Sequence, residues 1–464
     1  MIDIKKLLAG LVSVSMCFAV VIASTVAYLS GVFGTDEAPV PPGEVTEGIF
    51  LDRNGIEITS YSPEGKNHPA VLNFSKSMSH LIGYNSTRLG TSGLRNTLKD
   101  YILTGGKDDT GATITLTVDA YLQEALCSLL DGHKGSISIV NAKTGEILVL
   151  LSRSNSEVLF EADRVDEAYA RDKDGKVLQY YSDYYNSIDG LYINMATLAE
   201  DSGGSVIKVI TAYGLLSNGM GEITYYDADG TFLDGKIHNY AHTPYYETDL
   251  GKALINSSNV YFANAALTLG NKRMRDTFST FMLGNEITLD FTTLNSNYAN
   301  AQYLDDFILA STGYGQGQLQ ISPLHIASII GTVVSGDGRM MKPYLIDNIA
   351  DDGKQKEGTK KEVLTVIDTE VSHKLKELLA STAESYGLYD GFNKEDVTII
   401  AKSGTAETWR NNGNHTYFGV GVEFGDNAYG ICIDFVDEDV MSSSLIPCVN
   451  EIINELITAC DIRG

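Results

Sequence analysis

The sequence predicts an α+β fold, in which helices cover an antiparallel β-sheet. Near the C-terminus, residues 397–401, 416–424 and 428–435 have the length and residue types of strands, and a Gly-Asp-Asn turn joins the last two. Residues 136–140 and 146–151 flank an Asn-Ala-Lys-Thr-Gly turn and form a further predicted hairpin. Runs with helical spacing lie between these strands. Hairpins mixed with helices, without a βαβ repeat, favour an antiparallel sheet.

Length and composition indicate a globular chain with one large domain and smaller attachments. The 464 residues exceed what one hydrophobic core usually organises. A hydrophobic fraction of 43% beside 20% charged residues is ordinary for globular proteins. The 34 basic and 60 acidic residues give a formal charge of −26, which repels phosphate backbones, so we expect no nucleic-acid partner. The five cysteines make an odd number, and no disulfide framework follows from them.

The N-terminus carries a targeting signal. Lys5 and Lys6 precede an uncharged, largely apolar stretch, residues 7–35, and about 20 apolar residues suffice to span a bilayer. The alternative is a signal peptide cut near the small residues 23–27, but signal-peptide apolar cores usually have about 7–15 residues. We therefore interpret residues 1–35 as a cytoplasmic tip and an uncleaved transmembrane helix. The short positive tip stays in the cytoplasm, so the rest of the chain faces outward.

Residues 36–110 are predicted to form a linker and a small juxtamembrane region. Three prolines between residues 36 and 48 indicate an extended linker off the membrane. Beyond it, Asp52-Arg53-Asn54-Gly55 is typical of a turn between apolar residues. The pattern becomes regular from Gly111, where a strand at 114–118 precedes a helix at 119–130. We place the main domain at residues 111–464.

Several further elements are predicted within the main domain. Residues 157–194 are rich in tyrosine and charge, with weak periodicity, and indicate a long excursion from the core. Gly203-Gly204 precedes an apolar-periodic run, residues 206–216, which predicts a helix opened by glycines. A second helix should cover residues 259–269 and end at Gly270. A final helix is expected at residues 443–460.

One Ser-x-x-Lys pattern stands at the start of the helix that follows the two glycines. Ser205 and Lys208 share a face of the first turn, so the lysine amine can reach the serine hydroxyl. Lysine can deprotonate serine if burial or nearby positive charge lowers its pKa toward about 7–8. The N–H groups of a helix N-terminus can also stabilise an oxyanion. By itself, however, the pattern favours a helix that happens to begin with serine and carries an exposed lysine.

Two other patterns gain weight from their order along the chain. Ser257-Ser258-Asn259 precedes a helix and, alone, indicates an N-cap. Lys402-Ser403-Gly404-Thr405 follows a strand, where a glycine permits close approach of a ligand to the backbone; alone, it fits an ordinary edge strand. Together with Ser205 and Lys208, they form the motif set described for penicillin-binding proteins and class A β-lactamases, whose third motif is Lys-Thr-Gly.

The chain resembles class B penicillin-binding proteins over nearly all of its length after the anchor. Accessory segments share this similarity and separate the chain from β-lactamases: Asp52-Arg53-Asn54-Gly55, Leu116-Thr117-Val118-Asp119 with Gln123, Thr144-Gly145-Glu146-Ile147, Gly315-Gln316-Gly317 and Ser322-Pro323-Leu324. The resemblance implies the penicillin-binding and β-lactamase-like transpeptidase fold for residues 111–464. The region before it, residues 36–110, is shorter than the pedestal domain of many relatives.

The resemblance implies a serine acyltransferase that cross-links peptidoglycan stem peptides and is a target of β-lactams. Ser205 would attack the penultimate D-Ala carbonyl, with Lys208 as its base. Ser257 would relay a proton to the leaving amine, and Asn259 would hold Lys208 and the substrate amide. The implied carboxylate site is made of residues of the third motif: Lys402, Ser403, Gly404 and Thr405. The N–H groups of Ser205 and Thr405 would form the oxyanion hole.

The chain departs from the family pattern at two positions. Gly203 stands where proline is common, and Ser403 replaces a threonine while keeping the hydroxyl. Neither change removes a catalytic atom. Two alternatives belong to other functional classes: a non-catalytic scaffold or β-lactam sensor, and a hydrolase of the D,D-carboxypeptidase or β-lactamase type.

The expected setting is the cell membrane, with a single spanning helix and the catalytic domain outside the cytoplasm. Expected partners are peptidoglycan stem peptides, β-lactams and, by resemblance, a polytopic glycosyltransferase of the cell-wall machinery. We expect no cofactor and no metal. His238 and His242 have a metal-ligand spacing, but Asn239 stands where a zinc peptidase would have glutamate.

Overall fold

The computed structural model describes most of the chain after the predicted anchor. The described residues are 45–66, 68–86, 89–104, 109–156, 159–165, 191–199, 201–298, 304–351, 354–357, 361–407, 413–438 and 440–461. The predicted anchor, residues 1–35, and most of the predicted excursion, residues 157–194, lie outside them. Among the described residues, no helix combines the length and the apolar character needed to cross a bilayer. From Thr46 on, the described residues belong to one unit, Thr46–Gly464.

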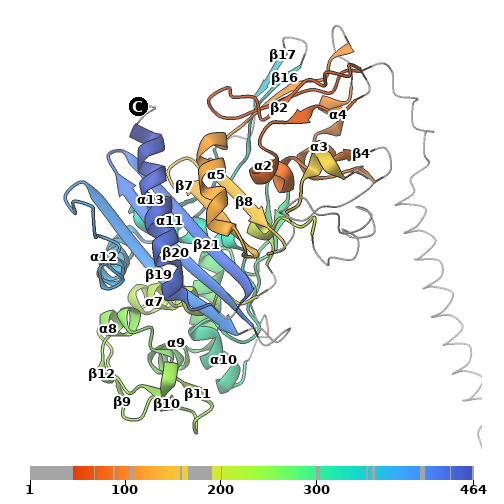
Figure 1. Ribbon diagram of the computed structural model, residues 1–464. Helices are drawn as coiled ribbons and strands as arrows, with labels where there is room; N and C mark the ends of the chain where they lie inside the picture. The colour runs from red at the N-terminus through yellow and green to blue at the C-terminus, as the bar shows by residue number, and fades with distance from the viewer. Residues whose placement is uncertain are drawn as a thin grey trace, which may run out of the picture. The chain divides into compact units, whose positions relative to one another are not determined.

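A five-stranded antiparallel sheet forms the centre of this unit (Figure 1). Its strand order is β19-β20-β21-β7-β8, and the strands are β19 (Val397–Glu407), β20 (Asn414–Phe424), β21 (Asn427–Glu438), β7 (Gly135–Asn141) and β8 (Ile147–Arg153). Every pair of neighbours is antiparallel. The predicted sheet is therefore confirmed. Its strands extend beyond the apolar runs from which they were predicted. β19 lies at one edge, where only β20 pairs with it.

Helices cover both faces of the sheet, as predicted. One face packs against α11 (Pro323–Ser335), and Ile330 joins a core cluster with Ile400. The other face packs against α13 (Ile446–Asp461) and α5 (Ala120–Leu126), whose apolar side chains share a second cluster with alternate residues of the same strands. The two clusters follow from the alternation of side chains along a strand, since each strand is buried on both faces.

Five helices of the described chain surround the site. They are α7 (Lys208–Ser217), α8 (Leu250–Ile255), α9 (Asn259–Thr280), α10 (Asp306–Gly313) and α12 (Thr369–Ser385). Of these, α7 and α9 begin close to their predicted positions, and the other three were not predicted. A short 3-10 turn, η5 (Gly204–Ile207), leads directly into α7. At Gly270, where α9 was expected to end, the backbone leaves helical geometry with φ 73° and ψ 166°, yet a further helical segment continues to Thr280. The last helix is preceded by η7 (Ser442–Leu445).

The segment before Gly111 packs onto the domain through short elements. These are β1 (Phe50–Leu51), β2 (Thr59–Ser60), β3 (Val71–Leu72), α2 (Ser75–Ile82), β4 (Asn85–Ser86), β5 (Gly90–Thr91), α3 (Gly93–Thr97) and α4 (Lys99–Ile102). β1 adds in parallel to β6 (Thr113–Leu116), in a sheet of order β1-β6-β16-β17. The buried Arg95 guanidinium bonds Glu47 Oε1 at 2.9 Å and the carbonyl oxygens of Gly83 and Ala70. A buried charge is tolerated because it is paired in this way.

Short connecting elements complete the described chain. They are η2 (Cys127–Leu130), η3 (Ala162–Arg164), η4 (Met195–Thr197), β9 (Tyr225–Asp227), β10 (Thr231–Phe232), β11 (Ile237–His238), η6 (Tyr240–His242), β12 (Tyr246–Thr248), β13 (Ile287–Thr288), β14 (Thr293–Leu294), β15 (Arg339–Met341), β16 (Ile346–Asp351), β17 (Lys354–Glu357) and β18 (Val363–Val366). The predicted turn at Asp52 is present: its carboxylate accepts the N–H groups of Asn54 and Ile56, and also that of Ala120 at the start of α5.

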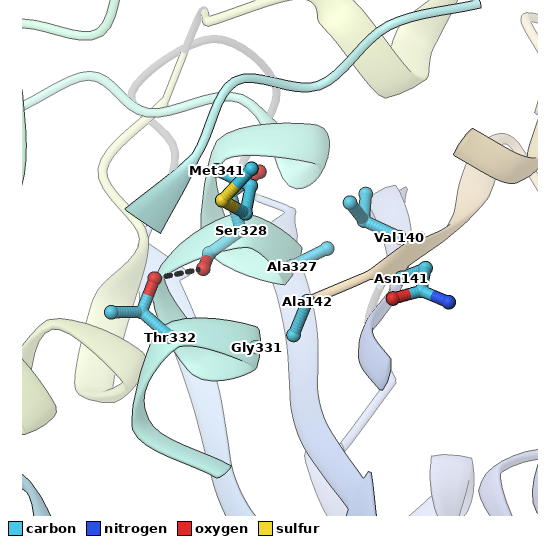
Figure 2. A pocket seen from close by; sticks show the side chains of 8 residues that line it. All are labelled: Val140, Asn141, Ala142, Ala327, Ser328, Gly331, Thr332 and Met341. Carbon is cyan, nitrogen blue, oxygen red and sulfur yellow. Dashed lines mark hydrogen bonds between the residues drawn. The ribbon is translucent and has the colours of Figure 1, made fainter. Parts of the chain in front are cut away.

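Small residues let α11 approach the sheet closely. A Cβ added at Gly430 of β21 would lie 1.9 Å from the carbonyl oxygen of Ala327. A Cβ added at Gly331 would lie 3.2 Å from the Cβ of Ala142. Figure 2 shows a small cavity at this contact, about 10 Å³, lined by Val140, Asn141, Ala142, Ala327, Ser328, Gly331, Thr332 and Met341. Its lining contains no residue of the three motifs, so we interpret it as a packing gap between helix and sheet.

We predict that Gly430→Ala destabilises the protein because its methyl group would push α11 away from β21. Overpacking of this kind typically costs about 1–3 kcal/mol of the free energy of unfolding. Gly251→Ala is a suitable control, since a Cβ there has its nearest neighbours at 3.5 Å. Thermal melts of the two variants should show a lower Tm for Gly430→Ala only. Equal melting temperatures would contradict the close helix–sheet contact.

Candidate active site

Ser205 and Lys208 meet at the junction between η5 and α7. The positive φ of Gly204, 53°, opens the turn, and Ser205 follows it directly. Lys208 is the first residue of α7 and is fully buried. Its Nζ lies 2.9 Å from Ser205 Oγ. The spacing of three residues thus brings the two groups into hydrogen-bond contact, as the sequence predicted, although the serine stands on a 3-10 turn.

The surroundings of Lys208 fit an uncharged amine. Its Nζ lies 2.6 Å from the Ser257 carbonyl oxygen and 2.7 Å from Asn259 Oδ1, and both atoms can only accept hydrogen bonds. An uncharged amine has two N–H groups for these two oxygens, and its lone pair is then left for the Ser205 hydroxyl. Burial, and next the positive charge of Lys402, hold the pKa of Lys208 well below its ordinary value. The arrangement can therefore take a proton from Ser205.

The second motif contributes two side chains and one helix cap. Ser257 adopts φ 52° in the connection between α8 and α9, a strained conformation for a residue other than glycine. Its Oγ lies 3.1 Å from Lys208 Nζ. The N-cap of α9 is Ser258, whose hydroxyl accepts the N–H of Tyr261. Asn259 is held from its other end, since Nδ2 donates to the His238 carbonyl oxygen at 2.9 Å. Because Ser258 caps the helix, the side chains of Ser257 and Asn259 are available for contacts with Lys208.

Lys402 brings a second buried lysine side chain to the site. Its Nζ lies 3.1 Å from Ser257 Oγ, the same hydroxyl that Lys208 contacts. Two further acceptors within the described part of the chain are the Ser403 carbonyl oxygen at 3.0 Å and the Tyr386 hydroxyl at 3.2 Å. Lys402 is fully buried on β19. The structure therefore joins all three motifs in one hydrogen-bonded group centred on Ser257.

Glycines place the Ser205 turn directly against β19. A Cβ at Gly404 would lie 2.7 Å from the Gly203 carbonyl oxygen, and one at Gly204 would lie 2.7 Å from the Thr405 carbonyl carbon. A Cβ at Gly315, in the Gly-Gln-Gly segment, would lie 1.7 Å from the Gly204 carbonyl oxygen. Gly404 of the third motif was expected to let a ligand approach the backbone closely. In the structure it lets the turn that carries Ser205 lie close to β19.

Two residues at or beside the site were missed by the sequence analysis. Tyr386, the C-cap of α12, contacts Lys402 and Ser403, but it stands sixteen positions before Lys402 in an unremarkable helix end. His415, in β20, bonds Asp201 and Asp434. Asp201 lies four residues before Ser205, so this cluster ties the Ser205 turn to the sheet. A polar residue inside an apolar strand is the signal that could have identified His415.

His238 and His242, which have a metal-ligand spacing in the sequence, lie beside each other in the structure. The rings of His238 and His242 stack with centroids 4.4 Å apart. In the part of the chain that the structure describes, no group of three or more His, Cys, Asp or Glu side chains could hold a metal ion.

Comparison with known proteins identifies the family. The family model for the penicillin binding protein transpeptidase domain matches residues 135–428, which include all three motifs. The chain belongs to the penicillin-binding protein transpeptidase family. It is 27% identical to penicillin-binding protein 3 of Bacillus subtilis over 396 residues, covering 79% of this chain and 54% of that protein. It is 24% identical to the peptidoglycan D,D-transpeptidase MrdA of Escherichia coli over 334 residues, covering 66% and 49%.

The fold of the transpeptidase family is also found in solved structures that are similar to this chain. A D,D-transpeptidase domain of a peptidoglycan glycosyltransferase from Eggerthella lenta has a TM-score of 0.75 at 21% identity, with 91% of this chain and 100% of that chain covered. Penicillin-binding protein A from M. tuberculosis, as a ceftriaxone acyl-enzyme, has a TM-score of 0.77 at 18% identity, with 89% and 98% covered. The chain spans about half the length of the curated relatives that it matches.

The His415 cluster should make the stability of this penicillin-binding domain depend on pH. Burial disfavours the imidazolium, but the bonds to Asp201 and Asp434 outweigh it and raise the pKa of His415. The contribution of protonated His415 to the stability of the folded state is therefore complete below the ordinary histidine pKa of about 6.5. It is lost as pH rises through the raised pKa of His415. We predict that Asp201→Asn moves this loss to lower pH, because it removes one of the two carboxylates.

Melting temperatures measured from pH 5 to pH 9 would check this prediction, together with NMR titration of the His415 ring. His373→Gln is the control, since His373 is exposed on α12 and should leave the pH profile unchanged. An identical profile for the parent and Asp201→Asn would show that Asp201 does not influence the protonation of His415.

Proposed function

We propose that this chain is a serine acyltransferase that cross-links peptidoglycan stem peptides by D-Ala-D-Ala transpeptidation, and that β-lactams acylate it. The observation that carries the proposal is the buried Lys208 amine, held by the Ser257 carbonyl and the Asn259 amide so that it faces Ser205. A base in hydrogen-bond contact with a serine is what nucleophilic catalysis needs. The names of the matched relatives, penicillin-binding protein and D,D-transpeptidase, support the reaction class.

In the proposed acylation, Ser205 Oγ attacks the carbonyl carbon of the penultimate D-Ala while Lys208 takes the hydroxyl proton. The negative charge of the tetrahedral intermediate falls on the former carbonyl oxygen. The backbone N–H groups of Ser205 and Thr405 would stabilise it, and the close contact between their chain segments supports this pairing. The carbon–nitrogen bond then breaks, and Ser257 passes the proton from Lys208 to the departing D-Ala amine. Ser205 is left as an ester.

The deacylation reverses the proton path. The amine of a second stem peptide attacks the ester carbonyl, and its proton passes through Ser257 toward Lys208. Collapse of the intermediate returns a proton to Ser205 Oγ and leaves a new peptide bond between the two stems. The side chains of the chain itself supply every acid and base in this cycle, so the proposal requires no cofactor.

We assign the terminal carboxylate of the donor stem to the third motif. Lys402 contributes a buried positive charge, and the half-buried Ser403 and Thr405 contribute hydroxyl donors on the edge strand β19. A carboxylate that leaves water for a partly buried site needs such partners, because an unpaired buried charge is costly. β-Lactams carry a carboxylate beside a strained amide and would occupy the same position.

We further propose that residues 7–35 anchor the chain in the cell membrane and hold residues 111–464 outside the cytoplasm, where the cell wall is built. The uncharged stretch after Lys5 and Lys6 supports the anchor. Residues 36–110 would serve as the linker and juxtamembrane region. A polytopic glycosyltransferase that supplies glycan strands at the membrane is the partner we infer for this arrangement.

We predict that Ser205→Ala abolishes acylation by penicillin and that Lys208→Ala lowers its rate by roughly 10²–10⁴-fold, the usual contribution of a general base. The double variant should be no slower than Ser205→Ala, because the two residues serve one step. Intact-mass spectrometry after exposure to penicillin, followed by peptide mapping, measures the adduct. Lys252→Ala, which removes an exposed lysine of α8, is the control and should acylate normally.

The products separate the proposed reaction from its alternatives. A label on any residue other than Ser205 would contradict the assignment of the nucleophile. Incubation with stem peptides should yield cross-linked dimers in which one D-Ala has been lost. Acylation without dimers would instead favour a β-lactam sensor, and release of the acyl group to water would favour a carboxypeptidase or β-lactamase.

The topology prediction is that the full chain stays in the membrane with its C-terminus outside. A reporter fused after Gly464 should be active only outside the cytoplasm and should fractionate with membranes. A chain lacking residues 1–35 is the control and should be lost from the membrane fraction. Reporter activity in the cytoplasm, or a mature chain that begins after Ala27 and is free of the membrane, would overturn the anchor.

A further inference from the structure

Tyr386 occupies a position in the site that no motif indicates. It is the residue that ends α12, and this helix packs against β19. Its ring meets Phe418 of β20 edge to face, with centroids 5.4 Å apart. The hydroxyl lies 3.2 Å from Lys402 Nζ and 3.0 Å from Ser403 Oγ. One side chain thus contacts the two neighbouring residues of the third motif that are assigned to the substrate carboxylate.

Tyr386 is one of three acceptors that surround the Lys402 ammonium group. An ammonium group has three N–H donors. The contacts of Lys402 Nζ are Ser257 Oγ at 3.1 Å, the Ser403 carbonyl oxygen at 3.0 Å and the Tyr386 hydroxyl at 3.2 Å. Each donor therefore has its own acceptor, and the charge is fixed in place. Without the phenol, one donor of a fully buried lysine loses its partner among these side chains.

The phenol also determines the direction of the Ser403 proton. A tyrosine hydroxyl that accepts a hydrogen bond from Lys402 can still donate its own proton, and Ser403 Oγ, at 3.0 Å, is placed to accept it. The Ser403 proton is then directed to another partner, such as a carboxylate. Serine lacks the methyl group that restricts χ1 in threonine, so its hydroxyl needs an external partner to hold it.

We propose that Tyr386 is a positioning residue for the substrate carboxylate: its hydroxyl holds the Lys402 charge in place and directs the Ser403 hydroxyl toward the ligand. This inference rests on the proposed function and concerns the carboxylate subsite alone. The pKa of Tyr386 agrees with a tight link to Lys402: burial raises it, but the charge of Lys402 and the bonds to Ser403 and Lys402 outweigh burial and lower it.

The test compares Tyr386→Phe with Tyr389→Phe. Both tyrosines lie at or just after the end of α12, and their hydroxyl groups form hydrogen bonds with residues of β19. The Tyr389 hydroxyl, however, bonds the backbone of Ile399: it donates to the carbonyl oxygen and accepts from the N–H, each at 2.8 Å. The measurement is the rate of acylation by a penicillin and by the methyl ester of the same penicillin, with Tm recorded for each variant. The ratio of the two rates reports recognition of the carboxylate and is independent of how much protein is folded.

Tyr386→Phe should lower the preference for the free acid about tenfold, the usual effect of losing a hydrogen bond in a charged site. Tyr389→Phe should leave the preference as in the parent, whatever its Tm. Adding Ser403→Thr to Tyr386→Phe should restore part of the preference, because threonine holds its own hydroxyl more firmly. An unchanged preference in Tyr386→Phe, a gain in the preference, or no recovery in the double variant would overturn the bridging role. Failure of the parent itself to be acylated would instead refute the proposed function.

Discussion

Two buried lysines that share one hydroxyl group are the constraint on which the rest of the site depends. Lys208 and Lys402 each lie 3.1 Å from Ser257 Oγ, and both are fully buried. Two full charges so close in a poorly hydrated interior would repel each other strongly. The strain is relieved when one lysine loses its proton. Lys208 is that lysine, because burial and the charge of Lys402 both depress its pKa.

The fold serves this pair by bringing together chain segments that are distant in sequence. The sheet supplies Lys402 on an edge strand, where only β20 pairs with it and the Ser205 turn can lie against it. A polar support holds the second motif: the Asn239 amide oxygen accepts the Val260 N–H and the Ser258 hydroxyl, and its nitrogen donates to Asp227. These hydrogen bonds hold the second motif in place beside the two lysines.

The sequence predicted the three motifs and their meeting, because each is a local pattern whose residue types are set by chemistry. The positions of the five strands of the central sheet and of α5, α7, α9 and α13 followed from local sequence patterns, although Gly270 interrupts α9 and does not end it. The helices α8, α10 and α12 were not predicted. The role of Tyr386 could not be predicted, since it depends on a contact between the end of α12 and β19 that no sequence spacing indicates. His415 is marked in the sequence only as a polar residue in an apolar strand, and its partners Asp201 and Asp434 required the structure. The capping role of Ser258, between two residues that contact Lys208, likewise required the three-dimensional structure.

The backbone contact between the Ser205 turn and β19 limits how this chain can change during evolution. Gly204, Gly315 and Gly404 meet neighbouring backbone atoms at distances that leave no room for a side chain, so the base of the site is made of main-chain atoms. A substitution changes a side chain and leaves the main-chain atoms as they are. Larger residues at these three positions are therefore excluded unless the backbone around them moves. Changes in the shape of the site must come from the side chains that surround it.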